Sequence, residues 1–205
     1  DMGSVFFDPD RDGDLDLFVV SGGVECDPGD PILQDRLYIN DGNGNFGRAA
    51  EGLIPKLFES GSVVSVADIN QDGRDDLFIG GRTVPGNYPS SPRSFILINS
   101  GARFINETQK VAPSLANAGM VTSAIFSDVN NDDWPDLLVT YEWGPVRFYL
   151  NDKGRLSDKT SMVGLDSKIG WFSSISPGDI DNDGDIDFIV GNTGYNTKYK
   201  ASYLN

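Results

Sequence analysis

Four stretches of this 205-residue chain repeat one acidic pattern of nine residues, and their side chains favour a definite chemistry. Each copy has Asp at positions one, five and nine, Asp or Asn at position three, and usually Gly at position six. Carboxylates this close together repel one another, and a hard cation that prefers oxygen ligands relieves the repulsion. The copies span residues 8–16, 68–76, 128–136 and 179–187. We therefore predict up to four calcium sites.

The spacing suits Ca²⁺, which takes about six to eight oxygen ligands, because a tight loop can direct side chains one, three and five toward one centre. The backbone carbonyl of position seven and the carboxylate of position nine would complete the shell. The predicted side-chain ligands are Asp8, Asp10, Asp12, Asp16, Asp68, Asn70, Asp72, Asp76, Asp128, Asn130, Asp132, Asp136, Asp179, Asp181, Asp183 and Asp187. The predicted carbonyl ligands belong to Asp14, Arg74, Trp134 and Asp185.

Position six of the pattern requires a sharp turn, which Gly makes in the similar first part of the EF-hand loop. Gly13, Gly73 and Gly184 occupy it in three copies, whereas the third copy has Asp133. Asp can adopt the left-handed conformation at some cost, so the third site is expected to be the weakest. A single copy could also be a solvated acidic turn, but four spaced copies argue against that alternative.

The charge of the chain agrees with bound cations. Its formal net charge is −15, and four Ca²⁺ ions would add eight positive charges and leave −7. So acidic a chain, without a basic stripe, is not expected to bind nucleic acid or anionic membrane surfaces. No apolar run long enough for membrane insertion and no signal peptide is visible in the sequence.

Short apolar segments flank every acidic loop, and the first Asp residues of the loops lie 60, 60 and 51 residues apart. Runs rich in β-branched and aromatic residues predict strands buried on both faces, so each loop should join two antiparallel strands. The segments before the loops are 4–7, 62–67, 122–127 and 173–176, and those after them are 17–20, 77–80, 137–140 and 188–191.

A third strand is expected in each repeat, at 36–40, 95–99, 147–151 and 202–205, and fourth strands should begin near Phe46, Phe104 and Leu156. Four-stranded antiparallel units repeated in this way predict an all-β fold, a partial β-propeller of about four blades. The chain should form one domain, 1–205, with repeats of about 1–60, 61–120, 121–171 and 172–205. Helical turns are expected only within 49–57 and 109–118.

The loop between two strands, with an ending such as Phe78-Ile79-Gly80-Gly81, resembles the FG-GAP/VCBS repeats of integrin α subunits and many secreted bacterial proteins. The phrases RLYINDGNGNF and GNTGYNTKYKAS are most similar to bacterial proteins that carry a C-terminal ASPIC/UnbV domain. The resemblance implies a calcium-stabilised propeller and an extracytoplasmic location, but no particular ligand. The sequence departs from the family pattern at Asp133 and in its degenerate Phe-Gly and Gly-Ala-Pro elements.

The last repeat stops after its third predicted strand, so we expect a truncated, open arc that could self-associate through its exposed edges. A closed four-bladed ring is the alternative. Cys26 is the only cysteine and therefore forms no intrachain disulfide. Calcium loops would take the place of disulfides, which fits the periplasm, the cell surface or the medium.

Long connections should lie at the end of the sheets opposite the acidic loops, at 21–36, 80–94, 141–146 and 191–202. Irregular loops on a rigid scaffold often bind ligands. Their aromatic, basic and amide side chains could stack on sugars or anchor a protein loop, or could instead pack between blades. The candidates are Arg82, Tyr88, Tyr141, Trp143, Asn192, Tyr195, Asn196 and Lys198, with Arg147 and Trp171 beside them.

Catalysis is poorly supported, because a chain without His lacks the usual base of nucleophilic triads and the usual ligands of zinc. Glu25, Asp27 and Glu142 lie in the long connections and are the candidates for an acidic pair of the kind that hydrolyses glycosides. We therefore expect a non-enzymatic binding or scaffold module that recognises a protein or glycan. A fragment of a polysaccharide-degrading propeller and a purely structural spacer are the alternatives.

Overall fold

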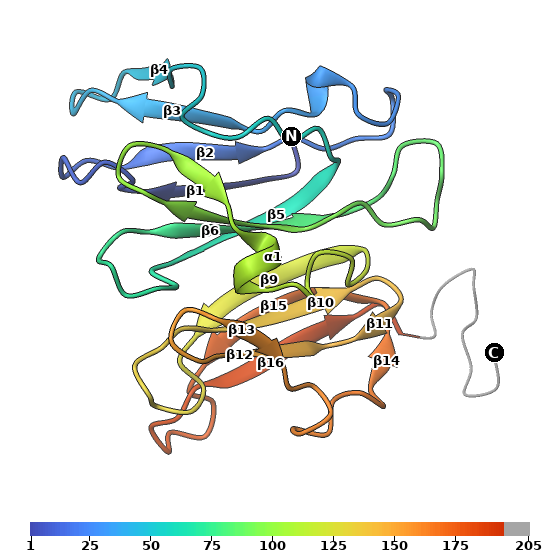
Figure 1. Cartoon of the computed structure of the whole chain (residues 1–205). Helices are drawn as coiled ribbons and strands as arrows, with labels where there is room; N and C mark the ends of the chain where they lie inside the picture. Colours follow the sequence, from blue (N-terminus) through green and yellow to red (C-terminus); the bar gives the residue numbers. More distant parts are fainter. Residues whose placement is uncertain (195–205) are drawn as a thin grey trace.

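The computed structural model describes residues 1–194 as an all-β protein made of antiparallel sheets (Figure 1). The first sheet contains β1 (Gly3–Phe7), β2 (Asp16–Val20), β3 (Arg36–Asn40) and β4 (Phe46–Arg48). The second contains β5 (Gly61–Ala67), β6 (Asp76–Gly81), β7 (Phe95–Asn99) and β8 (Phe104–Asn106). The third contains β9 (Val121–Ser127), β10 (Asp136–Tyr141), β12 (Arg147–Asn151) and β13 (Leu156–Asp158).

The predicted four-stranded unit is thus confirmed in three repeats, with strands that pair in chain order. In the fourth repeat β15 (Phe172–Gly178) pairs with β16 (Asp187–Asn192), and its predicted third strand lies outside the described residues. A small ladder joins β11 (Gly144–Pro145) to β14 (Ile169–Gly170). The helix α1 (Thr108–Val111) overlaps the expected turn at 109–118, whereas 49–57 contains no helix and a short 3-10 helix covers Pro31–Leu33.

The core consists of apolar layers between successive sheets. Phe18 of the first sheet packs with Leu77 of the second, and Phe78 on the opposite face of the second sheet packs with Leu137 of the third. A smaller layer around Leu138 joins the third sheet to β15 and β16. The middle strands β6 and β10 are therefore buried on both faces, as their uninterrupted apolar runs predict, whereas β2 is fully buried on one face only and β16 on neither.

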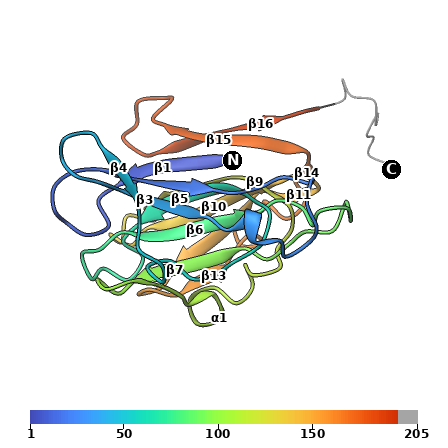
Figure 2. The ribbon, with the colours of Figure 1, turned by 90° about the horizontal axis from the view of Figure 1, so that it is seen from above.

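The first strands of the repeats, β1, β5, β9 and β15, lie next to one another in chain order, so the sheets form a row (Figures 1 and 2). This packing is close at the glycines that end the second strands. A Cβ at Gly80 would lie 2.5 Å from Cγ1 of Val121, at the start of β9. Gly80 is therefore required by the approach of the neighbouring sheet.

The antiparallel order places the acidic β1–β2, β5–β6, β9–β10 and β15–β16 loops at one end of the sheets, on the left of Figure 1. The long connections that follow the second strands lie at the opposite end, on the right. Within residues 1–194, none of the helices combines the length and the apolar character that a membrane span would need.

Asp35, just before β3, is a buried carboxylate away from the acidic loops, and its Oδ1 accepts a hydrogen bond of 2.8 Å from the backbone N–H of Ser21. Burial raises the pKa of Asp35 to about 7, against the lowering effects of the Ser21 bond and Arg36. The folded protein therefore binds a proton at Asp35 that the unfolded chain releases near pH 4.

We predict that Asp35→Asn stabilises the protein at neutral and alkaline pH. Because the folded pKa is raised, stability linked to Asp35 is complete below about pH 4 and is lost as pH rises toward 7. The gain in unfolding free energy should grow over this window and level off at on the order of 2–4 kcal/mol. Urea denaturation at several pH values in saturating calcium measures it, with exposed Asp27→Asn as the control. A pH-independent difference between Asp35→Asn and wild type would contradict this reasoning.

Candidate metal sites and the opposite loop surface

The four acidic loops adopt one backbone conformation. Position four is left-handed in every loop, with φ of 65° at Arg11, 54° at Gln71, 57° at Asn131 and 60° at Asn182. Position six is also left-handed in every loop, including φ of 68° at Asp133. The third loop therefore takes the same shape as the others, at the conformational cost that a non-glycine residue carries there.

The carboxylate at position one organises each loop from inside. In the second loop Asp68 accepts hydrogen bonds from the backbone N–H groups of Asp72, at 3.0 Å, and Gly73, at 2.7 Å. In the other loops the position-one carboxylate accepts the equivalent bond from the backbone N–H of Gly13, Asp133 or Gly184. The carboxylate at position five accepts from the N–H of position seven in all four. These bonds turn the side chains toward the loop centre.

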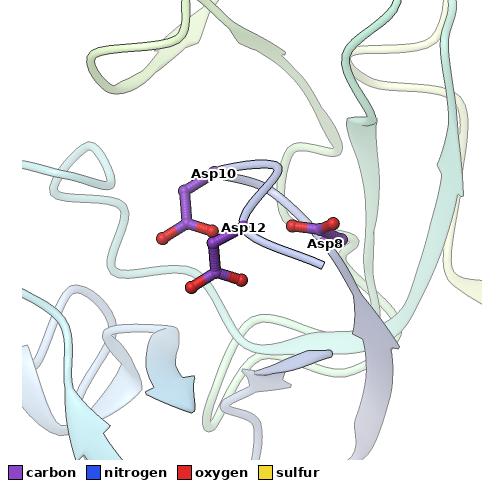
Figure 3. Close-up of side chains that lie close together, drawn as sticks. All are labelled: Asp8, Asp10 and Asp12. Carbon is purple, nitrogen blue, oxygen red and sulfur yellow. The ribbon is translucent and has the colours of Figure 1, made fainter. Parts of the chain in front are cut away.

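Two loops bring three carboxylates together, with one oxygen of each within 4.8 Å of the others. The first triad is Asp8, Asp10 and Asp12 (Figure 3), and the second is Asp179, Asp181 and Asp187. In the other two loops Asn occupies position three. Its amide donates to the position-five carboxylate, over 3.3 Å from Asn70 and 2.9 Å from Asn130.

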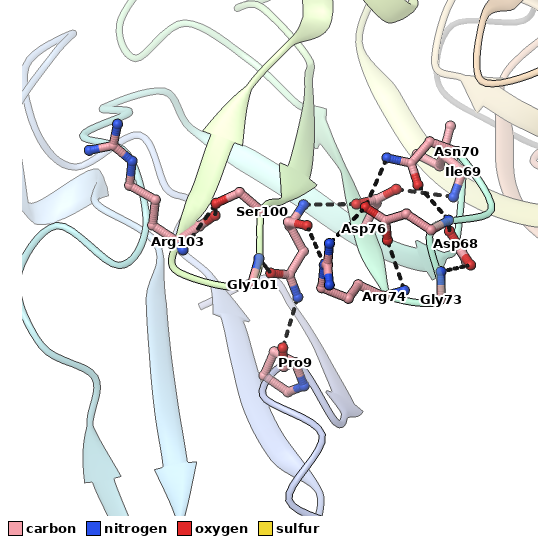
Figure 4. Close-up of polar contacts among 12 residues, drawn as sticks. Pro9, Asp68, Ile69, Asn70, Gly73, Arg74, Asp76, Ser100, Gly101 and Arg103 are labelled. Carbon is pink, nitrogen blue, oxygen red and sulfur yellow. Dashed lines mark hydrogen bonds and ion pairs between the residues drawn. The ribbon is translucent and has the colours of Figure 1, made fainter.

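In the first three loops the carboxylate at position nine is buried where the second strand begins, whereas Asp187 of the fourth loop is partly exposed. Asp76 accepts from the backbone N–H of Ile69 and of Asn99, at 3.1 and 2.8 Å (Figure 4). Burial raises the pKa of Asp76 to about 7 and also raises the pKa of Asp16 and Asp136. These carboxyl groups therefore hold a proton more readily than usual, and a bound cation would favour their ionised form.

The first loop contains an exception that points to an absent partner. In the other loops one oxygen of the position-nine carboxylate accepts from the N–H of position two, but Pro9 has no N–H to donate. Oδ1 of Asp16 accepts from Asn40, whereas Oδ2 is buried without a hydrogen-bond partner. Oδ1 of Asp14 is buried and unpartnered as well. A bound Ca²⁺ would satisfy oxygens of this kind.

Asparagines at the ends of third strands join the loops of neighbouring sheets. The Asn99 side chain donates to the carbonyl of Pro9 over 2.8 Å (Figure 4), and the Asn151 side chain donates to the carbonyl of Ile69 over 3.0 Å. The Gln71 side chain also donates to the carbonyl of Asp133 over 2.8 Å. These bonds connect the first three acidic loops with one another or with the sheet that follows. The sequence signal for these links is the Asn that ends each third strand, whose role sequence reasoning missed.

At the opposite end, the structure gathers several predicted ligand-surface residues around Glu142. Arg82 forms an ion pair with Glu142, which is 3% exposed, and the Tyr88 hydroxyl donates to it over 2.8 Å. The Trp143 indole N–H donates to the Tyr88 oxygen over 2.7 Å, and the Trp143 and Trp171 rings lie 4.8 Å apart. We call Arg82, Tyr88, Glu142, Trp143 and Trp171 the aromatic cluster.

The aromatic cluster combines residues from the second and third repeats. Tyr88 and Trp143 are 55% and 46% exposed, so their rings remain accessible. A hollow of about 490 Å³ lies beside them, lined by Tyr88, Pro89, Ser91, Gly119, Met120 and Trp143. Glu142, considered from the sequence only as a possible catalytic acid, instead holds the cluster together through its buried contacts.

Other predicted ligand-surface residues lie elsewhere. Tyr141 follows the alternative of packing between sheets, because it ends β10 within the core and its hydroxyl lies 3.3 Å from that of Tyr149. Arg147 lies over the Tyr141 ring and pairs with Asp158. Asn192 is exposed at the end of β16. Tyr195, Asn196 and Lys198 lie outside the described residues.

Comparison with known protein families supports the repeats that the sequence and the structure indicate. The family described as FG-GAP-like repeat matches residues 8–79 and 128–190, which include all four acidic loops. No curated protein matches the chain. The matched segments cover more than half of the sequence and coincide with the hairpins described above. The chain therefore belongs to the FG-GAP-like repeat family.

Proposed function

We propose that this chain is a calcium-stabilised part of a β-propeller that acts as a non-enzymatic recognition or scaffold module outside the cytoplasm. The observation that carries the proposal is the set of four loops of one conformation that gather acidic oxygens, with Asp16 Oδ2 buried and unpartnered. Sheets that pack face to face, with their first strands adjacent, support the propeller architecture.

The residues fit calcium better than a transition metal, because the donors are carboxylate, amide and carbonyl oxygens. Each ion would be held by side chains one, three, five and nine of a loop and by the carbonyl of position seven. Bound Ca²⁺ supplies positive charge that offsets the carboxylate repulsion. Loops of this kind require abundant calcium when their affinity is modest, which supports a location outside the cytoplasm.

The aromatic cluster is the surface best suited to recognition. Its exposed Tyr88 and Trp143 rings offer flat apolar faces, and the buried Glu142 carboxylate with Arg82 fixes the loop that carries Trp143. Rings held in place bind with a small loss of side-chain freedom, whether the ligand is a sugar or a protein loop. Glu142 is engaged on both oxygens, which favours a positioning role over catalysis.

We predict that Trp143→Ala weakens ligand binding at least about tenfold, which corresponds to about 1.4 kcal/mol, because it removes the exposed ring. Glycan arrays and pull-downs in calcium would identify the ligand, and calorimetry would compare the variants. Met162→Ala, which removes an exposed apolar side chain outside the aromatic cluster, is the matched control. Ligands that bind Trp143→Ala and Tyr88→Ala as tightly as wild type would assign recognition to another surface.

A further inference from the structure

A hollow of about 550 Å³ lies beside the first sheet, between the ends of β3 and β4 and the segment 49–58 that leads to the second sheet. Gln34 holds this segment in place, because its side chain donates to the carbonyl of Pro55 over 3.2 Å and accepts from the N–H of Leu57 over 3.3 Å. All the residues that line the hollow belong to positions 31–58. Its volume is within the range of about 300–1,000 Å³ that is usual for small-molecule sites.

One lining residue, Asp35, has an oxygen that the fold does not use. Asp35 is only 6% exposed, and its Oδ1 accepts from Ser21, whereas no group within residues 1–194 donates to its Oδ2. In contrast to Oδ2 of Asp16, this oxygen is not sealed from solvent. In the second sheet a hydroxyl, that of Ser94, accepts the equivalent bond from Gly81 over 3.0 Å. The second carboxylate oxygen of Asp35 therefore exceeds the structural need and is available to a donor from outside the chain.

The hollow also contains a backbone donor, the N–H of Leu37. In the second and third sheets a Thr that follows the fourth strand accepts from the equivalent N–H of the third strand. The pairs are Thr108 with Ile96, over 2.9 Å, and Thr160 with Phe148, over 3.1 Å. Ala50 lies four residues after the start of β4, as these Thr residues do after the start of β8 and β13, so Leu37 has no such hydroxyl. Leu37 and Ala50 both line the hollow, and Leu37 is only two residues from Asp35.

The remaining charged residues of the hollow make it attractive to an anion. Its basic lining residues are Arg36, Arg48 and Lys56. Arg36 pairs with Asp1, and Lys56 pairs with Glu51 over 2.8 Å. Arg48 forms no ion pair within the described part of the chain, so its guanidinium group can pair with an anionic ligand group without losing another partner.

We propose that this hollow binds a free α-amino acid with a large apolar side chain. The α-ammonium group donates to Oδ2 of Asp35, and the α-carboxylate accepts from the N–H of Leu37 and pairs with Arg48. The apolar side chain packs against Ile54 and Phe58, which line the hollow and are partly buried.

The α-amino acid is the class of ligand that satisfies both kinds of group at once, because it has a cation and an anion on one carbon. A simple amine would leave the N–H of Leu37 and Arg48 unused, and a simple carboxylic acid would leave Oδ2 of Asp35 without a donor. The proposal is independent of calcium binding and of the aromatic cluster.

Isothermal titration calorimetry of the wild-type chain in calcium tests the site, with L-phenylalanine, L-leucine and L-tryptophan as probes. A pH of about 8 ensures that Asp35, whose pKa is about 7, is ionised. At least one of the three amino acids should bind with a Kd below about 1 mM. For L-phenylalanine, two analogues separate the ligand groups. 3-Phenylpropanoate lacks the ammonium group and 2-phenylethylamine lacks the carboxylate, and each should bind at least about tenfold more weakly than L-phenylalanine.

Two substitutions taken from the other sheets test the residues. Asp35→Ser introduces the side chain of Ser94, which keeps an acceptor for Ser21 and removes the second oxygen, so the protein should fold but bind at least about tenfold more weakly. Ala50→Thr introduces the hydroxyl that accepts from the third strand in the other sheets and should weaken binding as well. Asp166→Ser, which removes an exposed acid of the third repeat, is the matched control and should bind as wild type. Urea denaturation verifies that each variant is folded.

Failure of all three amino acids to bind folded wild type at about 10 mM would overturn the proposal. Analogues that bind as tightly as L-phenylalanine, or an Asp35→Ser variant that binds as wild type does, would overturn it too. NMR titration provides a second readout without substitutions. The amide signals of residues 35–37 and 50–58 should shift as the amino acid is added, and shifts confined to other parts of the chain would refute the site.

Discussion

Removal of calcium with EGTA should lower the melting temperature of this protein by more than about 10 °C. An ion at about 10–100 times its dissociation constant contributes roughly 1.4–2.7 kcal/mol of stability. Four such ions would contribute on the order of 6–11 kcal/mol, and each kcal/mol shifts the midpoint of a domain of this size by about 2–4 °C. Differential scanning calorimetry with calcium, with EGTA, and with EGTA followed by excess calcium measures the change.

The effect of EGTA should diminish as pH falls from 8 toward 5. Burial raises the pKa of Asp76 to about 7, so acid favours the protonated folded form, which competes with calcium. In the calcium-free protein, the protonated Asp76 stabilises the fold, and this contribution is lost as pH rises through about 7. Bound calcium should compensate for the loss in the same pH range. Asp12→Asn and Asp183→Asn should each remove part of the shift. A melting temperature that is unchanged by EGTA at pH 8 would remove the basis for calcium in the proposed function.

Asn151→Ala should lower the free energy of unfolding by about 2–4 kcal/mol in saturating calcium. The Asn151 side chain is buried and donates to the carbonyls of Ile69 and Pro135, at 3.0 and 3.1 Å, while its Oδ1 accepts from Gly154 over 2.9 Å. Truncation leaves buried backbone groups without partners, at about 1–3 kcal/mol for each group that water cannot reach. Urea denaturation followed by tryptophan fluorescence gives the difference.

Asn40→Ala is the matched control, because Asn40 ends the equivalent strand but makes an exposed bond within its own sheet. The loss of unfolding free energy caused by Asn40→Ala should stay below about 1 kcal/mol. Equal losses for Asn40→Ala and Asn151→Ala would mean that the links between sheets contribute little to stability. The comparison thus separates a capping role common to all repeats from a role in joining them.

The local patterns of the sequence predicted the hairpins well. An acidic loop between two apolar runs specifies a turn and two strands through neighbouring residues, so the strand pairs of all four repeats could be located. The left-handed conformation of Asp133 was likewise foreseen, because a fixed loop shape leaves that residue no alternative.

Features that depend on neighbouring repeats were harder to predict. The choice of Tyr141 as a ligand-surface candidate overlooked alternation, since Tyr141 follows Leu137 and Val139 on the face of β10 that packs on the second sheet. The contact of Glu142 with Arg82 and Tyr88 joins segments about fifty residues apart, which no local pattern encodes. The unpartnered oxygen of Asp16 could have been anticipated, because Pro9 at position two removes a donor that the other loops have.

The asparagine links fasten the first and second acidic loops to the sheet that follows each of them. When one of these loops unfolds locally, the carbonyl that accepts from Asn99 or Asn151 moves away, and the following sheet loses that hydrogen bond. Mechanical and thermal disturbances therefore pass along the row junction by junction, as in a linear array of coupled units. Among the described sheets, the second and third are each packed on both faces by another sheet and should be the last to open.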